Sequence, residues 1–476
     1  MVNIHVSQLA QQGRFQHGGA DAAGTRGGAR QQRRTTIMNT GKPTLTLSQP
    51  SQPRVVDPRL LVGDPAPWFH CASNVNPNFD FSTVAGRYVV LTFFGSTAHP
   101  VGKSLIESFL AATDVFTDPD FYCFGVSVDP ADRARADLTQ SRPGFDIFWD
   151  TERKVSQRYQ FAGAETPISA LQPVTYLLDP TLRVLGIFAT NDGRLQADSV
   201  LQVLKRLTKL GAPRPSQMQA PVLVVPHVLE RELCQRLIDG YRNGNPAESG
   251  FMVERDGKTV ALHDHRHKRR SDWTITDRSL VEAVQERFRR RLLPEIKKAF
   301  SFDVTRMERH IVASYDQSGG YFRPHRDNTT KGTAHRRFAV TLNLNAEDYV
   351  GGDLMFPEFG RATYRAPTGG AVVFSCSLLH EALPIIRGQR FAYLPFLYDE
   401  AGAAIRQANN SHLGEGVQVY QMQQPRPALA PQDKPQGKGR GKGPQGKGRP
   451  QKGDRRGAKG GSGGNPNRPN PGNRSR

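Results

Sequence analysis

The sequence is poor in cysteine and has no long apolar run. Four cysteines in 476 residues provide no disulfide framework, which is typical of a reducing compartment. No stretch of 18 consecutive apolar residues occurs, so no membrane-spanning helix is expected. The first residues also lack the apolar core of a secretory signal. These absences predict a cytoplasmic protein that does not associate with membranes.

Acidic residues are scarce at both ends of the chain. Residues 1–57 carry seven Lys or Arg against two Asp, and residues 426–476 carry 14 against two, so the ends supply +17 of the net charge of +20. The segment PQGKGRGKGPQGKGRPQKGDRRGAKGGSGG has too few apolar residues to form a core, and no aromatic residues that could stack on bases. We therefore expect both ends to be disordered. Two roles for the tail stay open: electrostatic binding of nucleic acid or another polyanion, and simple solvation.

Two histidines and one aspartate have the spacing of a metal-ligand set. His325 and Asp327 stand at i and i+2 in YFRPHRDN, so an extended segment places both side chains on one face. His380 follows 55 residues later, at the end of GGAVVFSCSLLHE, whose β-branched and aromatic residues predict a strand. Two histidines and a carboxylate on one face of Fe(II) leave positions open for O2 and a chelating substrate. The pattern therefore predicts an oxygenase site in which His325, Asp327 and His380 are the metal-binding and catalytic residues.

An arginine near this set is a candidate anchor for a co-substrate. Arg390 follows His380 by ten residues, after an Arg387-Gly388 pair that is typical of a hairpin turn and would return the chain beside the His380 strand. Its guanidinium can hold a dicarboxylate through charge-assisted hydrogen bonds, and the expected ligand is 2-oxoglutarate. Because a distant strand supplies the third metal ligand only if the sheet curls back, we expect an antiparallel barrel or jelly roll.

Five segments occur in the order YDQSGGYFRPHRDN, RRFAVTLNLN, GGDLMFPEFG, APTGGAVVF and LHEALPIIRGQR. With them, residues 221–400 resemble the prolyl 4-hydroxylase type of 2-oxoglutarate and Fe(II)-dependent dioxygenases. The resemblance implies a double-stranded β-helix, an iron held by the three ligands above, and 2-oxoglutarate, O2 and ascorbate as further cofactors. It also implies that Arg390 binds the distal carboxylate of 2-oxoglutarate and that Tyr315 forms a hydrogen bond with 2-oxoglutarate. Many prolyl 4-hydroxylases carry lysine at the Arg390 position, which weakens the assignment of proline as the target.

Two apolar patterns before the metal set predict helices that support the barrel. Leucines recur every four residues in VLERELCQRLIDGY, and apolar residues recur in the same way in SLVEAVQERFRRRLL. The histidine-rich stretch HDHRH at 263–267 lies in a strongly polar region, so we interpret it as a solvated loop and not as a second metal site.

Residues 58–210 alternate between strand-like and helix-like segments in a βαβ and then ββα order, which predicts a thioredoxin-like domain. The segments GDPAPWF, GRYVVLTFFGSTAHPVGKS, YCFGVSVD and QPVTYLLDPTLRVLG resemble peroxiredoxins of the alkyl hydroperoxide reductase type. That family implies a reactive cysteine at a helix start, where this chain has Gly102 or Lys103, and no cysteine lies between Cys71 and Cys123. We therefore expect a scaffold, a dimerisation surface or a substrate-docking module without peroxidase activity.

These observations predict a multidomain chain: an α/β thioredoxin-like domain and then a double-stranded β-helix (jelly roll) domain with supporting helices. The expected parts are a basic segment at 1–57, the peroxiredoxin-like domain at 58–210, the dioxygenase domain at 219–400 and the basic tail at 401–476. The predicted function is hydroxylation of a protein or peptide residue, with proline the leading target. The alternative is a metal-binding sensor or scaffold without turnover, which recruits partners through the first domain and the tail. The substrate and the oligomeric state stay open.

Overall fold

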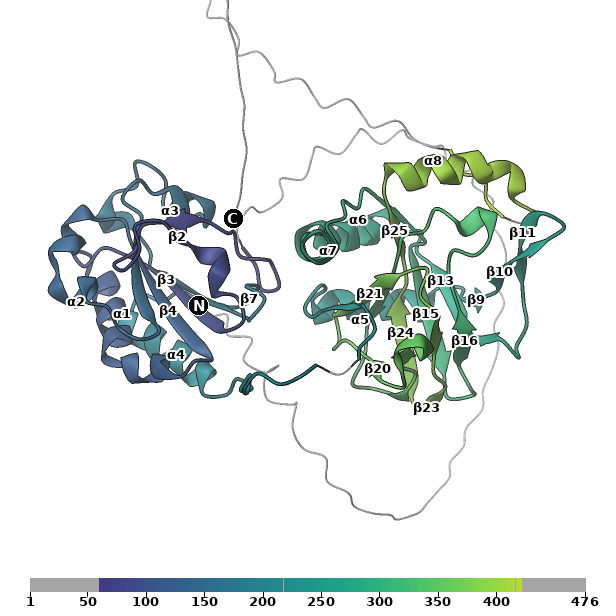
Figure 1. Cartoon of the computed structure of the whole chain (residues 1–476), viewed down its shortest axis with the longest axis horizontal. Coiled ribbons are helices and arrows are strands. Elements are labelled where there is room, and N and C mark those ends of the chain that lie inside the picture. Colours follow the sequence, from purple (N-terminus) through teal and green to yellow (C-terminus); the bar gives the residue numbers. More distant parts are fainter. Residues whose placement is uncertain (1–59, 217, 416, 422–476) are drawn as a thin grey trace, which may run out of the picture. The chain divides into compact units, whose positions relative to one another are not determined.

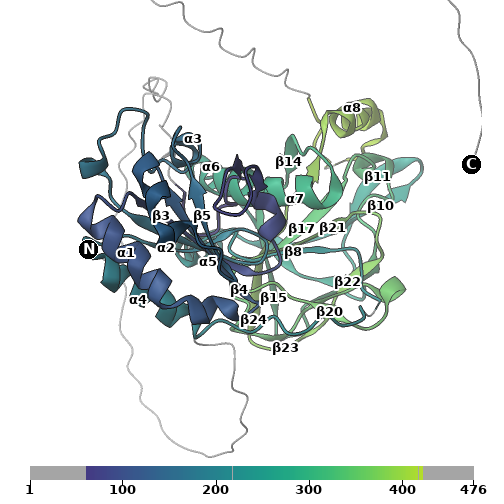
Figure 2. The ribbon, with the colours of Figure 1, turned by 60° about the vertical axis from the view of Figure 1, so that its left-hand side comes forward.

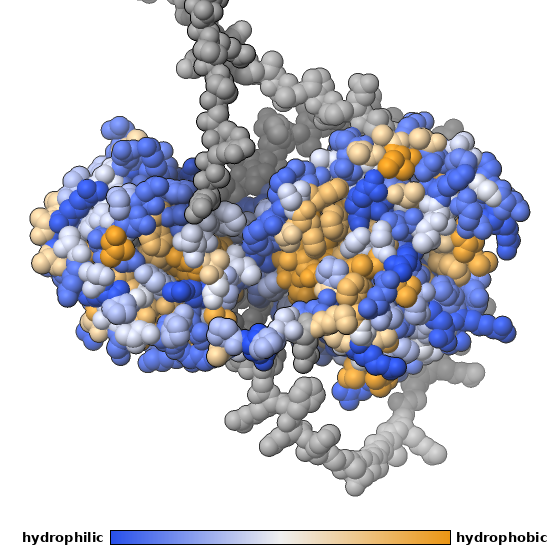
Figure 3. Space-filling model, in the orientation of Figure 1, coloured by the Kyte–Doolittle hydropathy of each residue, from blue (hydrophilic) through white to orange (hydrophobic). Residues whose placement is uncertain are grey.

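The computed structural model describes residues 60–216, 218–415 and 417–421; the disorder expected at 1–57 and in the tail beyond 421 lies outside the described residues. The described part contains a thioredoxin-like domain and a jelly-roll domain of two sheets, which confirms the predicted fold class (Figure 1). Among the described residues, no helix is long and apolar enough to cross a membrane. Hydrophilic side chains cover most of the face drawn in Figure 3.

Five strands form the sheet of the first domain, in the order β5-β4-β3-β6-β7. Strand β3 runs parallel to β4 and antiparallel to β6, and its sequence YVVLTFFG is mainly apolar because helices and loops cover both faces. The elements are β1 His70–Cys71, β2 Phe79–Asp80, η2 Phe81–Val84, β3 Tyr88–Gly95, α1 Pro100–Ala111, η3 Thr113–Thr117, β4 Phe121–Ser127, η4 Pro130–Ala134, α2 Ala136–Thr139, β5 Phe145–Trp149, α3 Lys154–Arg158, η5 Ile168–Ala170, β6 Val174–Leu178, β7 Val184–Phe188 and α4 Gly193–Leu204.

Different elements cover the two faces of this sheet. Helices α1 and α4 lie side by side on one face, where their leucine, valine and phenylalanine side chains join one apolar core (Figure 2). A second core on the other face is rich in aromatic rings: Phe69 stacks on Phe81 with ring centroids 4.6 Å apart and meets Phe148 edge-on at 5.2 Å. Such pairs add to the stability that burial alone provides.

The second domain consists mainly of two antiparallel sheets. The large sheet follows the order β14-β25-β17-β24-β15-β13-β9, with β21 and β8 joined to it through β17, and the small sheet follows β12-β16-β22-β19-β20. The strands are β8 Leu223–Val225, β9 Ala247–Glu248, β10 Phe251–Arg255, β11 Lys258–Leu262, β12 Lys268–Arg269, β13 Ser271–Thr274, β14 Arg306–Glu308, β15 Ile311–Asp316, β16 Tyr321–His325, β17 Phe338–Asn343, β18 Val350–Gly351, β19 Leu354–Met355, β20 Thr363–Tyr364, β21 Ala371–Ser375, β22 His380–Ala382, β23 Ile385–Arg387, β24 Gln389–Tyr393 and β25 Phe396–Tyr398.

Helices pack on the outer face of the large sheet, as the four-residue spacing of apolar residues predicts. Leu233 and Leu237 from one helix, and Leu280 and Val284 from another, are buried against strand residues of this sheet. Figure 1 shows α5, α6 and α7 together on that side. The helical elements are α5 Arg231–Asn243, α6 Arg278–Arg287, the π-helical η6 Phe288–Leu292, α7 Leu293–Phe300, η7 Lys331–Thr333, η8 Pro357–Phe359, α8 Glu400–Ala408 and η9 Asn409–His412.

Strand alternation divides each strand of the large sheet into an outer and an inner set of side chains. In β24, Phe391 and Tyr393 enter the core beneath the helices, so Arg390 points the other way, toward the small sheet. In β15, Val312 likewise faces the helices, and Tyr315 faces inward. Arg390 and Tyr315 are partners in strand register, so both side chains lie next to each other on the inner face of the large sheet.

The ordered structure continues past residue 400, where the sequence placed the end of the second domain. Helix α8 follows β25, and Asp399 caps its first turn by accepting a hydrogen bond from the Gly402 amide at 2.7 Å. The chain then runs along β11, where the Gly414 amide donates to the Thr259 carbonyl at 2.9 Å. This final segment lines one side of the cavity described below.

Candidate metal and co-substrate site

The three ligand candidates of the sequence converge in the second domain. One ligand atom from each of His325, Asp327 and His380 can be chosen so that all three lie within 4.8 Å of one another. His325 Nε2 lies 3.6 Å from Asp327 Oδ1, and His380 Nε2 lies 3.4 Å from Asp327 Oδ2. His380 is buried, and the other two are partly exposed toward the cavity. This compact set of two imidazole nitrogens and one carboxylate fits Fe(II) by number and type of donor.

The local backbone differs from the predicted one at two of these positions. His325 ends β16, and Asp327 lies in the following turn, held by its amide hydrogen bond to the Cys376 carbonyl at 2.9 Å. His380 does not end the strand AVVFS: β21 stops at Ser375 in the large sheet, and His380 begins β22 in the small sheet, opposite His325. The prediction of one continuous strand was therefore wrong, and the crossing between sheets brings His380 to the metal site.

The surroundings of the two rings prepare them as ligands. His325 Nδ1 lies 2.7 Å from the Arg323 carbonyl and His380 Nδ1 lies 3.0 Å from the Leu378 carbonyl. A carbonyl only accepts, so each Nδ1 is the protonated donor and each Nε2 keeps its lone pair for a metal. Burial lowers the pKa of His380 to about 4, which keeps that ring neutral. Burial alone would raise the pKa of Asp327, but His380 and His325 outweigh it and the pKa lies well below its ordinary value.

Arg390 lies across the cavity from the metal ligands. The turn at Gly388, whose φ is +81°, occurs as predicted, but β24 pairs with β15 and β17 and not with the His380 strand, so this part of the prediction was wrong. Arg390 is 3% exposed, its Nη1 donates to the Gly352 carbonyl at 2.6 Å, and its buried Nε has no partner among the described residues. Its guanidinium carbon lies 5.1 Å from the centre of the Tyr315 ring, the neighbour in strand register. A buried arginine whose Nε donor is unused fits a carboxylate ligand.

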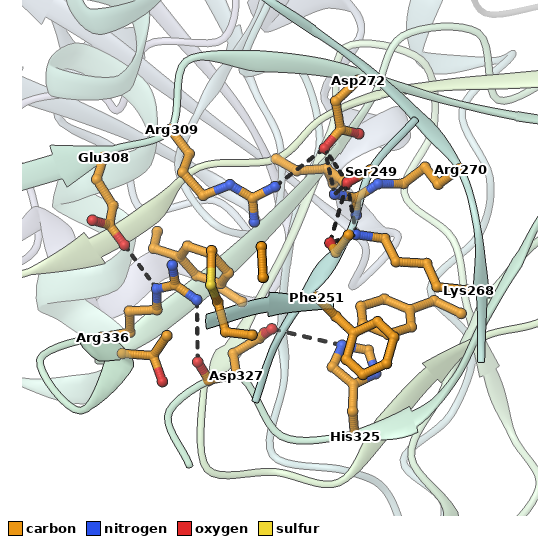
Figure 4. A pocket seen from close by; sticks show the side chains of 18 of the residues that line it. Ser249, Phe251, Lys268, Arg270, Asp272, Glu308, Arg309, His325, Asp327 and Arg336 are labelled. Carbon is orange, nitrogen blue, oxygen red and sulfur yellow. Dashed lines mark hydrogen bonds and ion pairs between the residues drawn. The ribbon is translucent and has the colours of Figure 1, made fainter. Parts of the chain in front are cut away.

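The cavity between the sheets has a volume of about 880 Å³ and contains all five site residues of the sequence prediction in its lining. It also contains charged residues that the sequence analysis missed. Figure 4 shows Lys268, Arg270, Arg309 and Arg336 around the same space as His325 and Asp327. The sequence could have indicated two of them, because Lys268 and Arg270 stand two residues apart, as side chains on one face of a strand do. No pattern in the sequence indicates that Arg309 or Arg336 faces the cavity.

The histidine-rich stretch of the sequence lies beside the cavity. HDHRH at 263–267 is a largely exposed turn, as expected, although His267 enters the cavity wall beside Phe251, with ring centroids 4.4 Å apart.

Glu308 binds Arg336 Nε at 2.7 Å, and Arg336 Nη1 donates to the Asp327 carbonyl at 3.2 Å. Arg336 therefore connects a buried carboxylate to the backbone of a metal-ligand candidate.

The first domain offers no cysteine at the expected reactive position. Helix α1 begins at Pro100, with His99 as its N-cap, and Gly102 lies in the first turn. A β-carbon at Gly102 would stand 2.2 Å from the Phe94 carbonyl oxygen, which leaves no room for a side chain. Burial raises the pKa of the Cys71 thiol to about 12 and that of Cys123 well above its ordinary value, so neither is an activated thiolate.

A jelly roll with two histidines and a carboxylate on one side of its cavity and an inward arginine on the other has groups that can bind Fe(II) and a carboxylate ligand together. Comparison with known proteins agrees: residues 310–398 match the model of the 2OG-Fe(II) oxygenase superfamily, and residues 62–186 match that of the AhpC/TSA family. The first match implies Fe(II), 2-oxoglutarate and O2 as the cofactors of that family.

Individual relatives are similar to separate parts of the chain. A PKHD-type hydroxylase of Synechococcus sp. (strain CC9605) is 30% identical over 107 residues, which are 22% of this chain and 48% of the relative; the chain thus spans about half the length of that relative. A prolyl hydroxylase from Trichoplax adhaerens, solved with a hypoxia inducible factor peptide, covers 39% of this chain and 86% of its own at 19% identity, with a TM-score of 0.30. Peroxidoxin BcpB from Mycobacterium tuberculosis covers 32% of this chain and 100% of its own at 18% identity, with a TM-score of 0.29.

Proposed function

We propose that the chain hydroxylates a protein or peptide residue, with Fe(II) and 2-oxoglutarate in the second domain, and that proline is the leading target. The observation that carries the proposal is the convergence of His325, Asp327 and His380 in one cavity with the partly unpaired Arg390. The PKHD-type relative supports hydroxylase chemistry. We further propose that ascorbate supports turnover and that the chain is divided as the sequence predicts, except that the second domain continues past residue 400 through helix α8.

Each site residue has a role that follows from its position. His325, Asp327 and His380 would hold Fe(II) through two neutral imidazoles and one ionised carboxylate. Arg390 would bind the distal carboxylate of 2-oxoglutarate, and the Tyr315 hydroxyl would orient it. The bound iron supplies oxidation by O2, coupled to decarboxylation of 2-oxoglutarate to succinate. The walls of the cavity would position the substrate beside the three metal-ligand candidates.

The thioredoxin-fold domain is proposed to bind a partner or to serve as a scaffold, without peroxidase activity. Two features support this role: no cysteine occupies the first turn of α1, and the two cysteines of the domain have raised thiol pKa values.

The first experiment measures succinate release by anaerobically purified protein given Fe(II), ascorbate and 2-oxoglutarate and then exposed to O2, with and without peptides from a cell extract. Wild-type protein should release succinate, and peptides should accelerate release. Asp327→Ala should abolish release, because a two-ligand site loses the metal. Release that is unchanged in Asp327→Ala contradicts the metal assignment. Iron binding without any succinate release favours the sensor or scaffold alternative.

A further inference from the structure

A second group of cations lies in the cavity, apart from Arg390. Lys268, Arg270 and Asp272 occupy alternate positions where the chain crosses from β12 in the small sheet to β13 in the large sheet. Arg270 Nη2 binds Asp272 Oδ2 at 2.7 Å, and Arg309 Nη2 approaches the same oxygen at 3.3 Å. Ser249 joins the group: its hydroxyl accepts from Lys268 Nζ at 2.7 Å and from Arg270 Nη2 at 3.0 Å. Figure 4 shows these groups gathered on one side of the cavity.

Positive charge in this group exceeds negative charge. Arg270 and Arg309 share the carboxylate of Asp272, whose neighbours in strand register, Ala313 and Ala247, carry no charge. Lys268 is 4% exposed and forms no ion pair with any carboxylate of the described residues; its other contacts are the Gly250 carbonyl at 2.6 Å and the face of Phe322. Arg270 is 8% exposed, and its buried Nε has no partner among the described residues. Burial lowers the pKa of Lys268 well below its ordinary value, so an incoming anion would restore the charge on Lys268 and would pair with the buried Arg270.

The group is distinct from the arginine assigned to the co-substrate. Tyr315 stands between the two: Arg390 lies 5.1 Å from its ring centre on one side, and Arg270 lies 5.8 Å from it on the other and donates to its hydroxyl at 3.3 Å. The cavity as a whole is lined by seven Lys or Arg side chains and four carboxylates, one of which is Asp327. Its 880 Å³ is far more than one five-carbon dicarboxylate fills. Space and charge for a second anion therefore remain beside the co-substrate.

We propose that Lys268, Arg270 and Arg309 form a second anion-binding subsite that takes a carboxylate of the primary substrate, so that the protein acts on acidic peptide segments. This inference rests on the proposed function and narrows its substrate class. Asp272 and Ser249 orient the cations, and the subsite places the acidic side chain so that a neighbouring residue of the peptide reaches the metal site. Two molecules can supply a carboxylate to this subsite: 2-oxoglutarate through its distal end, and the peptide through its acidic side chain. The experiment below distinguishes between them.

The test uses the full chain, immobilised and loaded with Mn(II) and 2-oxoglutarate, and two pools of acetylated, amidated random hexapeptides. One pool contains a single Asp or Glu in each peptide, and the matched pool contains Asn or Gln instead. Retained peptides are counted by mass spectrometry. Wild-type protein should retain the acidic pool about tenfold more than the amide pool, the factor expected for a charged hydrogen-bond partner. Lys268→Met with Arg309→Met should remove that preference.

Two controls make the result specific. The exposed Arg387, outside the cavity lining, supplies a control variant, Arg387→Met, which removes a positive charge away from the subsite and should keep the preference. Binding of 2-oxoglutarate, measured by calorimetry, should survive in the double variant. Equal retention of both pools by wild-type protein overturns the inference, as does an acidic preference that persists in the double variant. Loss of 2-oxoglutarate binding with an intact preference assigns the subsite to the co-substrate and also overturns it. If wild-type protein binds no 2-oxoglutarate, the proposed function fails instead, whichever peptide pool is retained.

Discussion

At the scale of single residues, Arg390 and Arg387 show how surroundings decide the role of an arginine. Arg390 is buried in the cavity wall, and Arg387 is exposed three residues earlier. Arg390→Ala should weaken 2-oxoglutarate binding by about tenfold or more, because a charge-assisted pair is lost from a desolvated site. Arg387→Ala should leave the affinity unchanged. Calorimetric titration with Mn(II) in place of Fe(II) measures both, and equal affinities in the two variants would remove Arg390 from the co-substrate site.

Asp272 is the residue whose ionisation should couple the cavity to pH. Burial would raise its pKa, but Arg270 and Arg309 outweigh it and lower the pKa from 3.8 to about 2. An acid with a lowered pKa stabilises the fold fully above the unfolded-state value, and this contribution disappears as pH falls through the folded-state value. Asp272→Asn should therefore lower the free energy of unfolding by roughly 3 kcal/mol at pH 7, because the buried Arg270 and the partly exposed Arg309 lose their counterion.

Urea unfolding at several pH values measures this effect. The stability difference between wild-type protein and Asp272→Asn should be constant above pH 4 and should shrink between about pH 4 and pH 2. A difference that stays constant down to pH 2 would show that Asp272 is not the ionised partner of the two arginines.

At the scale of elements, the start of α1 decides whether the first domain can hold a reactive thiol at position 102. A side chain there meets the backbone carbonyls of Phe94 and Ser96, at 2.2 and 2.7 Å from the β-carbon. Gly102→Cys should therefore destabilise the domain by roughly 2 kcal/mol or more and should not create peroxidase activity. Gly163→Ala, where the nearest atom is the Thr166 hydroxyl at 3.3 Å, is the matched control and should change stability by less than about 0.5 kcal/mol. Thermal unfolding and a peroxide-consumption assay test both variants.

The elements also show what the sequence alone could predict. The barrel and its supporting helices followed from strand and helix periodicity, and the spacing of His325, Asp327 and His380 predicted that these three side chains lie close together. The crossing between β21 and β22 did not, because SCSLL has no proline or glycine to mark a break, and the break follows from pairing with β16 in the other sheet. Pairing partners depend on residues far apart in the sequence, so β24 was also placed beside the wrong strand. Arg309 could not be found either, since its inward direction depends on a left-handed backbone at φ +65°.

At the scale of the whole molecule, the functions of the cavity and of the basic tail should be separable. Within the described part of the chain, the residues that line the cavity lie at or before Tyr420. Deletion of residues 423–476 removes 14 Lys or Arg and two Asp, which lowers the net charge from +20 to +8. The shortened chain should keep its succinate release and should elute from heparin at a lower salt concentration, because polyanion binding depends on the number of cations. Unchanged elution would show that the tail does not bind polyanions.

The four cysteines, finally, are distributed evenly between the two domains. Cys71 and Cys123 belong to the first and Cys234 and Cys376 to the second, and burial raises the thiol pKa of each, to about 12 for Cys71 and Cys234. Alkylating reagents attack the thiolate, so the native chain should react slowly and each thiol should gain reactivity only when its own domain opens. The rate of alkylation at each cysteine, read by peptide mass spectrometry, therefore reports separately how often each half of the protein unfolds.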